Sequence, residues 1–263
     1  MQKGDYQMIK IAFFDVDGTI IDMERRQITE NMVNTLQILQ KTGIKICVAT
    51  GRAPYIVPKI EGVTFDCYLT FNGSYCYSNT QEIFCNPICN QDVQQIVINA
   101  KSIGLPVLLA TKSSSFANGC DPNLKEYMAI SKQKVNVIDD FQTASKQEIY
   151  QMMIGCNPSQ YDTILKDTKN AAITAWWDKA ADVIPLNGSK GLGVSKILDY
   201  FHFSKDEAIA FGDGSNDLEM LQSVSTSVAM ANGTDDIKQI ASFICGSVKE
   251  DGIYYFCKQH NLI

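Results

Sequence analysis

Long apolar runs are missing from this sequence of 263 residues. No stretch approaches the roughly 18 consecutive apolar residues that a membrane-spanning helix needs. The N-terminal stretch holds only a short apolar run, which Asp15 interrupts, so it does not resemble a signal peptide. Met1 to Gln7 look like a dispensable lead-in. We therefore expect a cytoplasmic protein with no membrane partner.

Paired cysteine motifs and clustered basic residues are lacking as well. The nine cysteines contain no Cys-x-x-Cys pair, and no histidine or second pair completes a zinc set around Cys85 and Cys89. Scattered thiols in an odd number fit a reduced cytosolic protein better than a disulfide framework. The net charge is −6 and Lys and Arg are not clustered, so the sequence does not predict a basic surface that binds nucleic acid. An acidic enzyme that handles anions must build a local positive site from metal, lysine or helix N-termini.

The length and composition are those of a soluble globular protein with room for two domains. The hydrophobic content is 45% and the charged content is 20%, and no internal repeat or low-complexity tract is present. A chain of this length is long for one compact core.

Strands and helices alternate at both ends of the chain, which predicts a parallel sheet wrapped by helices. Thr29 can cap a helix that ends at Gly43, and Ser189 can cap a second helix. The predicted strands cover residues 9–14, 44–49, 67–71, 208–211 and 227–230, with a hairpin over residues 75–84.

The middle of the chain changes character and reads as an insertion. We expect helices over 92–101, near Leu124 and over 159–167, and strands near Val107 and Phe116 and over 149–155 and 172–177. The expected domains are a core formed by residues 1–84 and 186–263 and an inserted α/β domain formed by residues 85–185.

Five predicted strands of the outer parts end in polar residues. The endings are DVD, TGR, NG, GDGSND and ANG. Ligands of open α/β sheets bind outside the carboxyl ends of the strands, so these endings should converge on one crevice.

Two like charges, Asp15 and Asp17, follow the first buried strand. Adjacent carboxylates repel each other, and a divalent cation removes that cost. Together with Asp213 they can gather around Mg²⁺, which prefers oxygen ligands. A turn or a helix cap is the alternative reading of the pair. The alternatives for GDGSND are a plain loop or a calcium-binding loop. A calcium-binding loop has Glu at its twelfth position, and counting from Asp213 that position holds Val224.

A carboxylate at such a site can attack phosphorus once metal and lysine offset the repulsion between two anions. Lys190 opens a predicted helix whose N-terminus adds backbone N–H donors. Thr50 supplies a hydroxyl and Gly51 an approachable backbone N–H. The alternatives are a solvated Lys190 and a Thr50 that only caps a turn.

Four motifs occur in a fixed order and carry a resemblance. DVDGT from Asp15, TGR from Thr50, Lys190 and GDGSND from Gly212 resemble the four motifs of the haloacid dehalogenase (HAD) superfamily. NG at Asn72, AMANG from Ala229 and EDG from Glu250 look like the Cof-type subfamily (IIB), which is similar to sugar-phosphate phosphatases. The resemblance covers the chain from about Ile9 onward. It implies an α/β fold with a Rossmann-like parallel-sheet core and an inserted α/β cap of the C2 type.

The resemblance also implies a role for each matching residue. Asp15 is the implied nucleophile and a Mg²⁺ ligand, and Asp17 is the implied general acid/base with a metal-binding backbone carbonyl. Asp213 is the implied acidic metal ligand, and Asp217 either supports the metal shell or orients Lys190. The expected phosphate- and substrate-binding residues are Thr50, Gly51, Arg52, Asn72, Lys190 and Asn216. A salt bridge is an equal alternative for Arg52.

The expected function is Mg²⁺-dependent hydrolysis of small phosphorylated metabolites, either sugar phosphates or phosphorylated cofactors, through an aspartyl-phosphate. The insertion, joined near Phe84 and Pro185, is expected to move as a lid and to carry selectivity. One alternative is a phosphomutase, which retains the phosphoryl group. The other is a non-catalytic sensor of phosphorylated metabolites, which would need no nucleophile. The sequence leaves the physiological substrate and the oligomeric state open.

Overall fold

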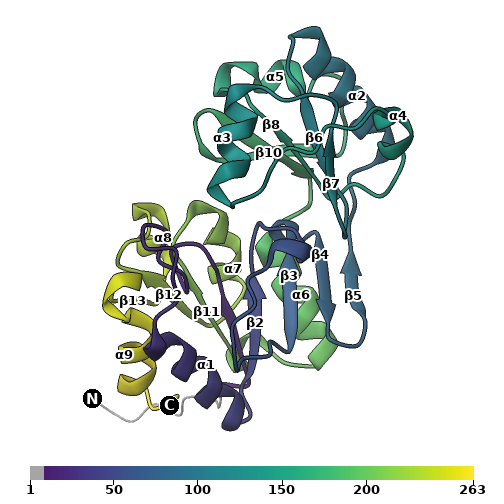
Figure 1. Cartoon of the computed structure of the whole chain (residues 1–263). Helices are drawn as coiled ribbons and strands as arrows, with labels where there is room; N and C mark the ends of the chain where they lie inside the picture. The colour runs from purple at the N-terminus through teal and green to yellow at the C-terminus, as the bar shows by residue number, and fades with distance from the viewer. Residues whose placement is uncertain (1–8) are drawn as a thin grey trace. The chain divides into compact units, whose positions relative to one another are not determined.

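The computed structural model of the chain describes residues 9–263, and the chain divides into two compact units (Figure 1). The core unit consists of the residues up to Gly51 together with Val57–Phe84 and Ser189–Ile263. The inserted unit consists of Arg52–Ile56 and Cys85–Gly188. Each unit has its own sheet. The lead-in expected over Met1 to Gln7 lies outside the described residues.

An eight-stranded sheet forms the centre of the core unit, in the order β13-β12-β11-β1-β2-β3-β4-β5. Neighbouring strands from β13 to β3 pair in parallel, and β4 pairs antiparallel with β3. The Rossmann-like parallel sheet expected from the sequence is therefore confirmed. The strands are β1 (Ile11–Phe14), β2 (Lys45–Ala49), β3 (Cys67–Thr70), β4 (Tyr75–Ser78), β5 (Glu82–Cys85), β11 (Ala208–Gly212), β12 (Thr226–Met230) and β13 (Phe243–Cys245).

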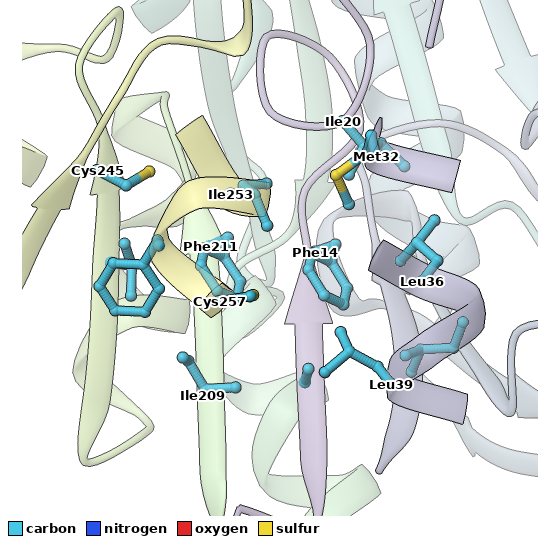
Figure 2. Packing of buried hydrophobic residues seen from close by; sticks show 14 of the residues in the cluster. Phe14, Ile20, Met32, Leu36, Leu39, Ile209, Phe211, Cys245, Ile253 and Cys257 are labelled. Carbon is cyan, nitrogen blue, oxygen red and sulfur yellow. The ribbon is translucent and has the colours of Figure 1, made fainter. Parts of the chain in front are cut away.

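Alternate side chains of the central strands enter two different apolar clusters. In β1, Ala12 and Phe14 join one cluster, whereas Ile11 and Phe13 join the other. The first cluster contains residues of the helices α1 (Glu30–Lys41) and α9 (Gly252–Gln259), and Figure 2 shows Leu36 and Ile253 of these helices beside Phe14. The second cluster contains residues of α6 (Lys190–Phe201), α7 (Leu218–Gln222) and α8 (Asp235–Ile240). Helices thus cover both faces, which explains why the strands read as continuous apolar runs.

Both predicted helix caps of the core unit are present. The Thr29 side chain accepts a hydrogen bond from the Met32 N–H, and the Ser189 hydroxyl accepts one from the Leu192 N–H. These bonds satisfy donors that the first turn of a helix leaves free. Among the described residues, no helix combines the length and the apolar character needed to cross a membrane.

The inserted unit is built on an antiparallel sheet in the order β7-β6-β8-β10-β9. Strand β10 was not expected from the sequence, and the helix expected over 159–167 shortens to α5 after a 3₁₀ turn. The strands are β6 (Val107–Ala110), β7 (Ser115–Ala117), β8 (Gln151–Ile154), β9 (Ala171–Trp177) and β10 (Ala180–Pro185). The helices are α2 (Asn90–Ser102), α3 (Pro122–Ile130), α4 (Phe141–Ala144) and α5 (Tyr161–Ile164).

The strand order of the core unit determines where polar loops gather. From β1 the chain adds β2 and β3 on one side, and it later adds β11, β12 and β13 on the other side. This reversal makes the carboxyl ends of β1 and β11 a topological switch point, where α/β sheets bind ligands. The five polar endings predicted from the sequence follow β1, β2, β3, β11 and β12, which are adjacent parallel strands.

Candidate active site

Asp15 stands directly at the carboxyl end of β1. Its N–H donates to the Phe211 carbonyl over 3.0 Å, so the backbone is still held by the neighbouring strand. The chain then turns, with Gly18 at φ +88°. A Cβ at Gly18 would lie 2.0 Å from the Asp213 carboxylate oxygen Oδ2. The glycine of DVDGT therefore permits both the left-handed backbone and the close approach of Asp213.

The GDGSND loop after β11 is closed by its own last residue. One Asp217 oxygen, Oδ2, accepts hydrogen bonds from the backbone N–H groups of Asp213 and Gly214, each over 3.0 Å. Asp217 is completely buried, and these bonds satisfy half of its carboxylate. The aspartate four residues after Asp213 therefore fixes the shape of the loop that presents Asp213.

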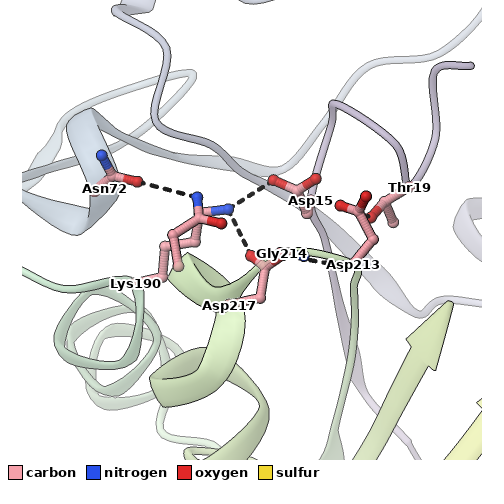
Figure 3. Close-up of polar contacts among 8 residues, drawn as sticks. Asp15, Thr19, Asn72, Lys190, Asp213, Gly214 and Asp217 are labelled. Atoms are coloured by element: carbon pink, nitrogen blue, oxygen red, sulfur yellow. Dashed lines mark hydrogen bonds and ion pairs between the residues drawn. The ribbon is translucent and has the colours of Figure 1, made fainter. Parts of the chain in front are cut away.

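Lys190 connects the two loops. Its ammonium nitrogen lies 2.6 Å from Asp15 Oδ1 and 2.6 Å from Asp217 Oδ1, as Figure 3 shows. Lys190 is the first residue of α6, and its side chain is fully buried. The alternative prediction of a solvated lysine is therefore wrong. A buried ammonium in an apolar core is costly unless it is paired, and here two carboxylates pair it.

The pKa values of the group reflect burial and crowding. Burial would by itself lower the pKa of Lys190, but the carboxylates of Asp15 and Asp217 more than offset it and keep the lysine charged. Burial raises the pKa of Asp15 well above its ordinary value, and nearby carboxylates add to this effect although Lys190 opposes it. Burial and the charge of Asp217 raise the pKa of Asp213 to about 7. The single positive charge of Lys190 does not neutralise the carboxylates of Asp15, Asp213 and Asp217.

A divalent cation fits this donor set. Carboxylate oxygens of Asp15, Asp213 and Asp217 all lie within 4.8 Å of one another. All of these donors are oxygens, the ligand type that Mg²⁺ prefers. Both Asp217 oxygens already accept hydrogen bonds, which favours the supporting position over direct contact with a metal. Asp15 and Asp213 are the carboxylates best suited to hold the ion.

Asp17 and Arg52 occupy different surroundings. Asp17 is half-buried in the turn after β1, and its charge raises the pKa of both Asp15 and Asp213, so the three carboxylates lie near one another. Arg52 groups with the inserted unit, and its guanidinium donates to the Ile56 carbonyl over 3.3 Å.

The other predicted phosphate-binding residues of the core unit follow β2, β3 and β11. Thr50 is buried and its carbonyl accepts a hydrogen bond from the Asn72 N–H over 3.1 Å. Asn72 has a left-handed backbone at φ 53°, which is uncommon for a residue other than glycine. Its side-chain oxygen accepts from the Asn216 amide over 3.4 Å and would lie 3.0 Å from a Cβ at Gly51. The structure thus brings these four residues together.

Two residues at the site were absent from the predicted set. The Thr19 hydroxyl donates to Asp213 Oδ1 over 3.3 Å, and the Asn232 amide donates to Asp213 Oδ2 over 3.3 Å. Both belong to sequence motifs already noted, DVDGT and ANG. Their positions after β1 and β12 were the available signal, because the ends of these strands lie on either side of β11.

A family model described as haloacid dehalogenase-like hydrolase matches residues 12–257. The chain is 31% identical over 256 residues to a Bacillus subtilis (strain 168) protein named "Putative phosphatase YkrA", covering 97% of this chain and 98% of the relative. It is 27% identical to the 5-amino-6-(5-phospho-D-ribitylamino)uracil phosphatase YitU of the same organism, covering 94% and 95%.

Two solved structures are similar over almost the full chain. BT1666 of Bacteroides thetaiotaomicron, described among phosphatases of the haloalkanoate superfamily, aligns with a TM-score of 0.90 and 27% identity, covering 100% of this chain and 98% of its own. BT4131, described as a HAD subclass IIB sugar phosphatase, aligns with a TM-score of 0.85 and 26% identity, covering 97% and 100%.

Proposed function

Because the chain belongs to the haloacid dehalogenase-like hydrolase family and is a phosphatase of that family, we propose that it hydrolyses small phosphorylated metabolites with Mg²⁺ through an aspartyl-phosphate on Asp15. The observation that carries the proposal is the position of Lys190. Its ammonium group holds two buried carboxylates at 2.6 Å where the strands β1 and β11 end. Such a cluster of buried charges is destabilising in an apolar core. Clusters of this kind are typical of functional sites, and this one suits an anionic substrate together with a cation.

Phosphoryl transfer to the protein is the first proposed step. A carboxylate oxygen of Asp15 attacks phosphorus, the new bond forms, and the bond from phosphorus to the leaving oxygen breaks. Asp17 in its protonated form gives its proton to the leaving alkoxide. Lys190 is available to balance the charge that gathers on the transferring group.

Hydrolysis of the aspartyl-phosphate is the second proposed step. Asp17, now a carboxylate, takes a proton from a water molecule whose oxygen attacks phosphorus. The bond between phosphorus and Asp15 breaks, inorganic phosphate leaves, and Asp15 and Asp17 return to their starting states. One group thus serves as acid and then as base.

Mg²⁺ bound by Asp15, Asp213 and the Asp17 backbone carbonyl would supply positive charge against the repulsion between carboxylate and phosphate ester. Asp217 supports this arrangement through Lys190 and through the loop that it closes. The proposed contacts to the phosphoryl group and the substrate come from Thr50, Gly51, Arg52, Asn72, Lys190 and Asn216.

We propose sugar phosphates or phosphorylated cofactors as the substrate class. Two relatives support this choice, since YitU is named for a phosphoribityl substrate and BT4131 is described as a sugar phosphatase. The inserted unit, proposed as a cap that moves over the strand ends, would carry selectivity among these metabolites. A reducing cytoplasmic setting fits the nine free cysteines of the chain.

Release of free phosphate by the full chain tests the proposal. p-Nitrophenyl phosphate is supplied with EDTA and then with excess Mg²⁺, and both p-nitrophenolate and inorganic phosphate are measured. We expect both products in equal amounts, only with Mg²⁺. When a sugar phosphate is added as acceptor, transfer of the phosphoryl group to it without free phosphate would instead identify a phosphomutase. Binding of phosphate esters without any turnover would identify a sensor.

A further inference from the structure

Asn232 connects three separate segments of the core unit although its side chain is exposed. Its amide nitrogen donates to the Gly18 carbonyl over 2.9 Å and to Asp213 Oδ2 over 3.3 Å. Its amide oxygen accepts from the Val248 N–H over 2.9 Å. A carbonyl only accepts and a backbone N–H only donates, so these partners fix the orientation of the amide.

The turn that carries Asn232 also holds the backbone of Asp213. The Thr234 N–H donates to the Asp213 carbonyl over 2.9 Å, and a Cβ at Gly233 would lie 2.9 Å from the same oxygen. Main chain and side chain of Asp213 are therefore both fixed by the segment after β12. Asn232 is exposed, so its side chain could bond water instead, and burial does not explain its three hydrogen bonds within the protein.

The chemical nature of the donors separates Asp213 from the other two carboxylates. Asp15 and Asp217 each accept a hydrogen bond from the charged Lys190. Asp213 accepts from two neutral donors, the Thr19 hydroxyl and the Asn232 amide. A neutral donor orients a carboxylate and leaves its negative charge uncompensated, which is the state that a cation ligand needs.

We propose that Asn232 is a positioning residue for divalent cation binding. It ties the Asp213 carboxylate to the Gly18 carbonyl, one residue after Asp17, so that the oxygens expected to share the cation keep a fixed spacing. This inference rests on the Mg²⁺ site of the proposed function. Partners that orient a metal ligand typically contribute about 10- to 100-fold to metal affinity or activity. Loss of the Asn232 amide should therefore weaken Mg²⁺ binding by at least about tenfold.

The test measures Mg²⁺ binding to the full chain by calorimetry without substrate, for the wild type and Asn232→Ala. Asn79→Ala is the matched control, because Asn79 is an exposed turn asparagine of the same unit whose amide donates to the Phe65 carbonyl over 2.8 Å. Asp213→Ala is the positive control and should lose Mg²⁺ binding altogether. Asn79→Ala should bind Mg²⁺ like the wild type.

Turnover gives a second readout that a purely structural role would not move. In Asn232→Ala the Mg²⁺ concentration for half-maximal activity should rise by about tenfold, and excess Mg²⁺ should restore most of the activity. The KM for p-nitrophenyl phosphate at saturating Mg²⁺ should stay within about twofold of the wild type, because uniform substrate binding is not removed. Asn232→Ser, whose hydroxyl is too short to span all three partners, serves if the alanine variant folds poorly.

The outcomes separate the two claims. If the wild type binds Mg²⁺ and both Asn232 variants bind it equally well, the positioning role is wrong and the proposed function stands. A lowered activity that excess Mg²⁺ does not restore would equally overturn the positioning role. If the wild type binds no Mg²⁺, the cation site of the proposed function is wrong, and the role of Asn232 fails with it.

Discussion

Two buried aspartates, one in each unit, have very different surroundings. Asp15 of the core unit lies 2.6 Å from the Lys190 ammonium group and near three further carboxylates. Asp182 of the inserted unit accepts a hydrogen bond from the neutral Tyr127 hydroxyl over 3.0 Å. Its burial raises its pKa to about 6.

The difference separates a structural carboxylate, Asp182, from Asp15, the carboxylate that we propose as the nucleophile. Asp182 has a neutral donor as its partner, and its raised pKa allows the carboxyl group to become neutral at mildly acidic pH. Asp15 instead belongs to a crowded charged group that stays costly without a cation.

Asp15→Asn should give the largest effect. The amide keeps the shape of the side chain but removes the attacking charge, so turnover of p-nitrophenyl phosphate should fall by roughly a thousandfold or more. Asp182→Asn in the inserted unit is the matched change and should leave this turnover near the wild-type value. An Asp15→Asn variant that kept a tenth of the activity would rule out Asp15 as the nucleophile.

Lys190→Met should destabilise the core unit because it leaves buried carboxylates without their cation. Removing one partner of a buried ion pair costs about 3–5 kcal/mol, and we expect a loss of this size in urea unfolding with EDTA. Addition of Mg²⁺ should recover part of it. The control is Lys10→Met, which breaks the partly exposed pair with Glu207 and should cost much less. Similar losses for both variants would show that the buried pair is not special.

Asp182→Asn should change how stability depends on pH. The folded-state pKa of Asp182, about 6, lies above the ordinary value of 3.8, so its contribution to stability is full below pH 3.8 and is lost as pH rises through 6. From about pH 4 to about pH 7, the wild type should therefore lose up to roughly 3 kcal/mol relative to the variant. Urea unfolding of both proteins across this range measures the difference, and parallel pH profiles would contradict the raised pKa.

Most of the parallel sheet could be predicted because each central strand is a continuous apolar run that ends in a polar motif. The positions of Asp15 and Asp213 directly after two such strands are enough to predict that the two carboxylates lie close together. Strand β10, which begins at Ala180 and contains Asp182, was missed because a charge interrupts its apolar pattern. Strand β13 has only three residues, too few to show a period.

Side-chain geometry was the part of the site that sequence patterns did not specify. The pattern GDGSND contains two aspartates and does not reveal that Asp217 uses both oxygens within the protein. Asn232 was overlooked for a related reason, since its three partners lie 214, 19 and 16 residues away in sequence. Such contacts follow from the strand order and not from any local period.

Asp17→Asn gives the most direct test of the covalent role of Asp15. The variant lacks the base that activates water, whereas p-nitrophenolate leaves without needing an acid, so the aspartyl-phosphate should accumulate. After rapid mixing with p-nitrophenyl phosphate and Mg²⁺, followed by acid quench and peptide mass spectrometry, we expect a burst of one p-nitrophenolate per protein and a phosphoryl group on Asp15. Steady release of p-nitrophenolate and phosphate together, with no burst and an unmodified Asp15, would contradict the aspartyl-phosphate mechanism.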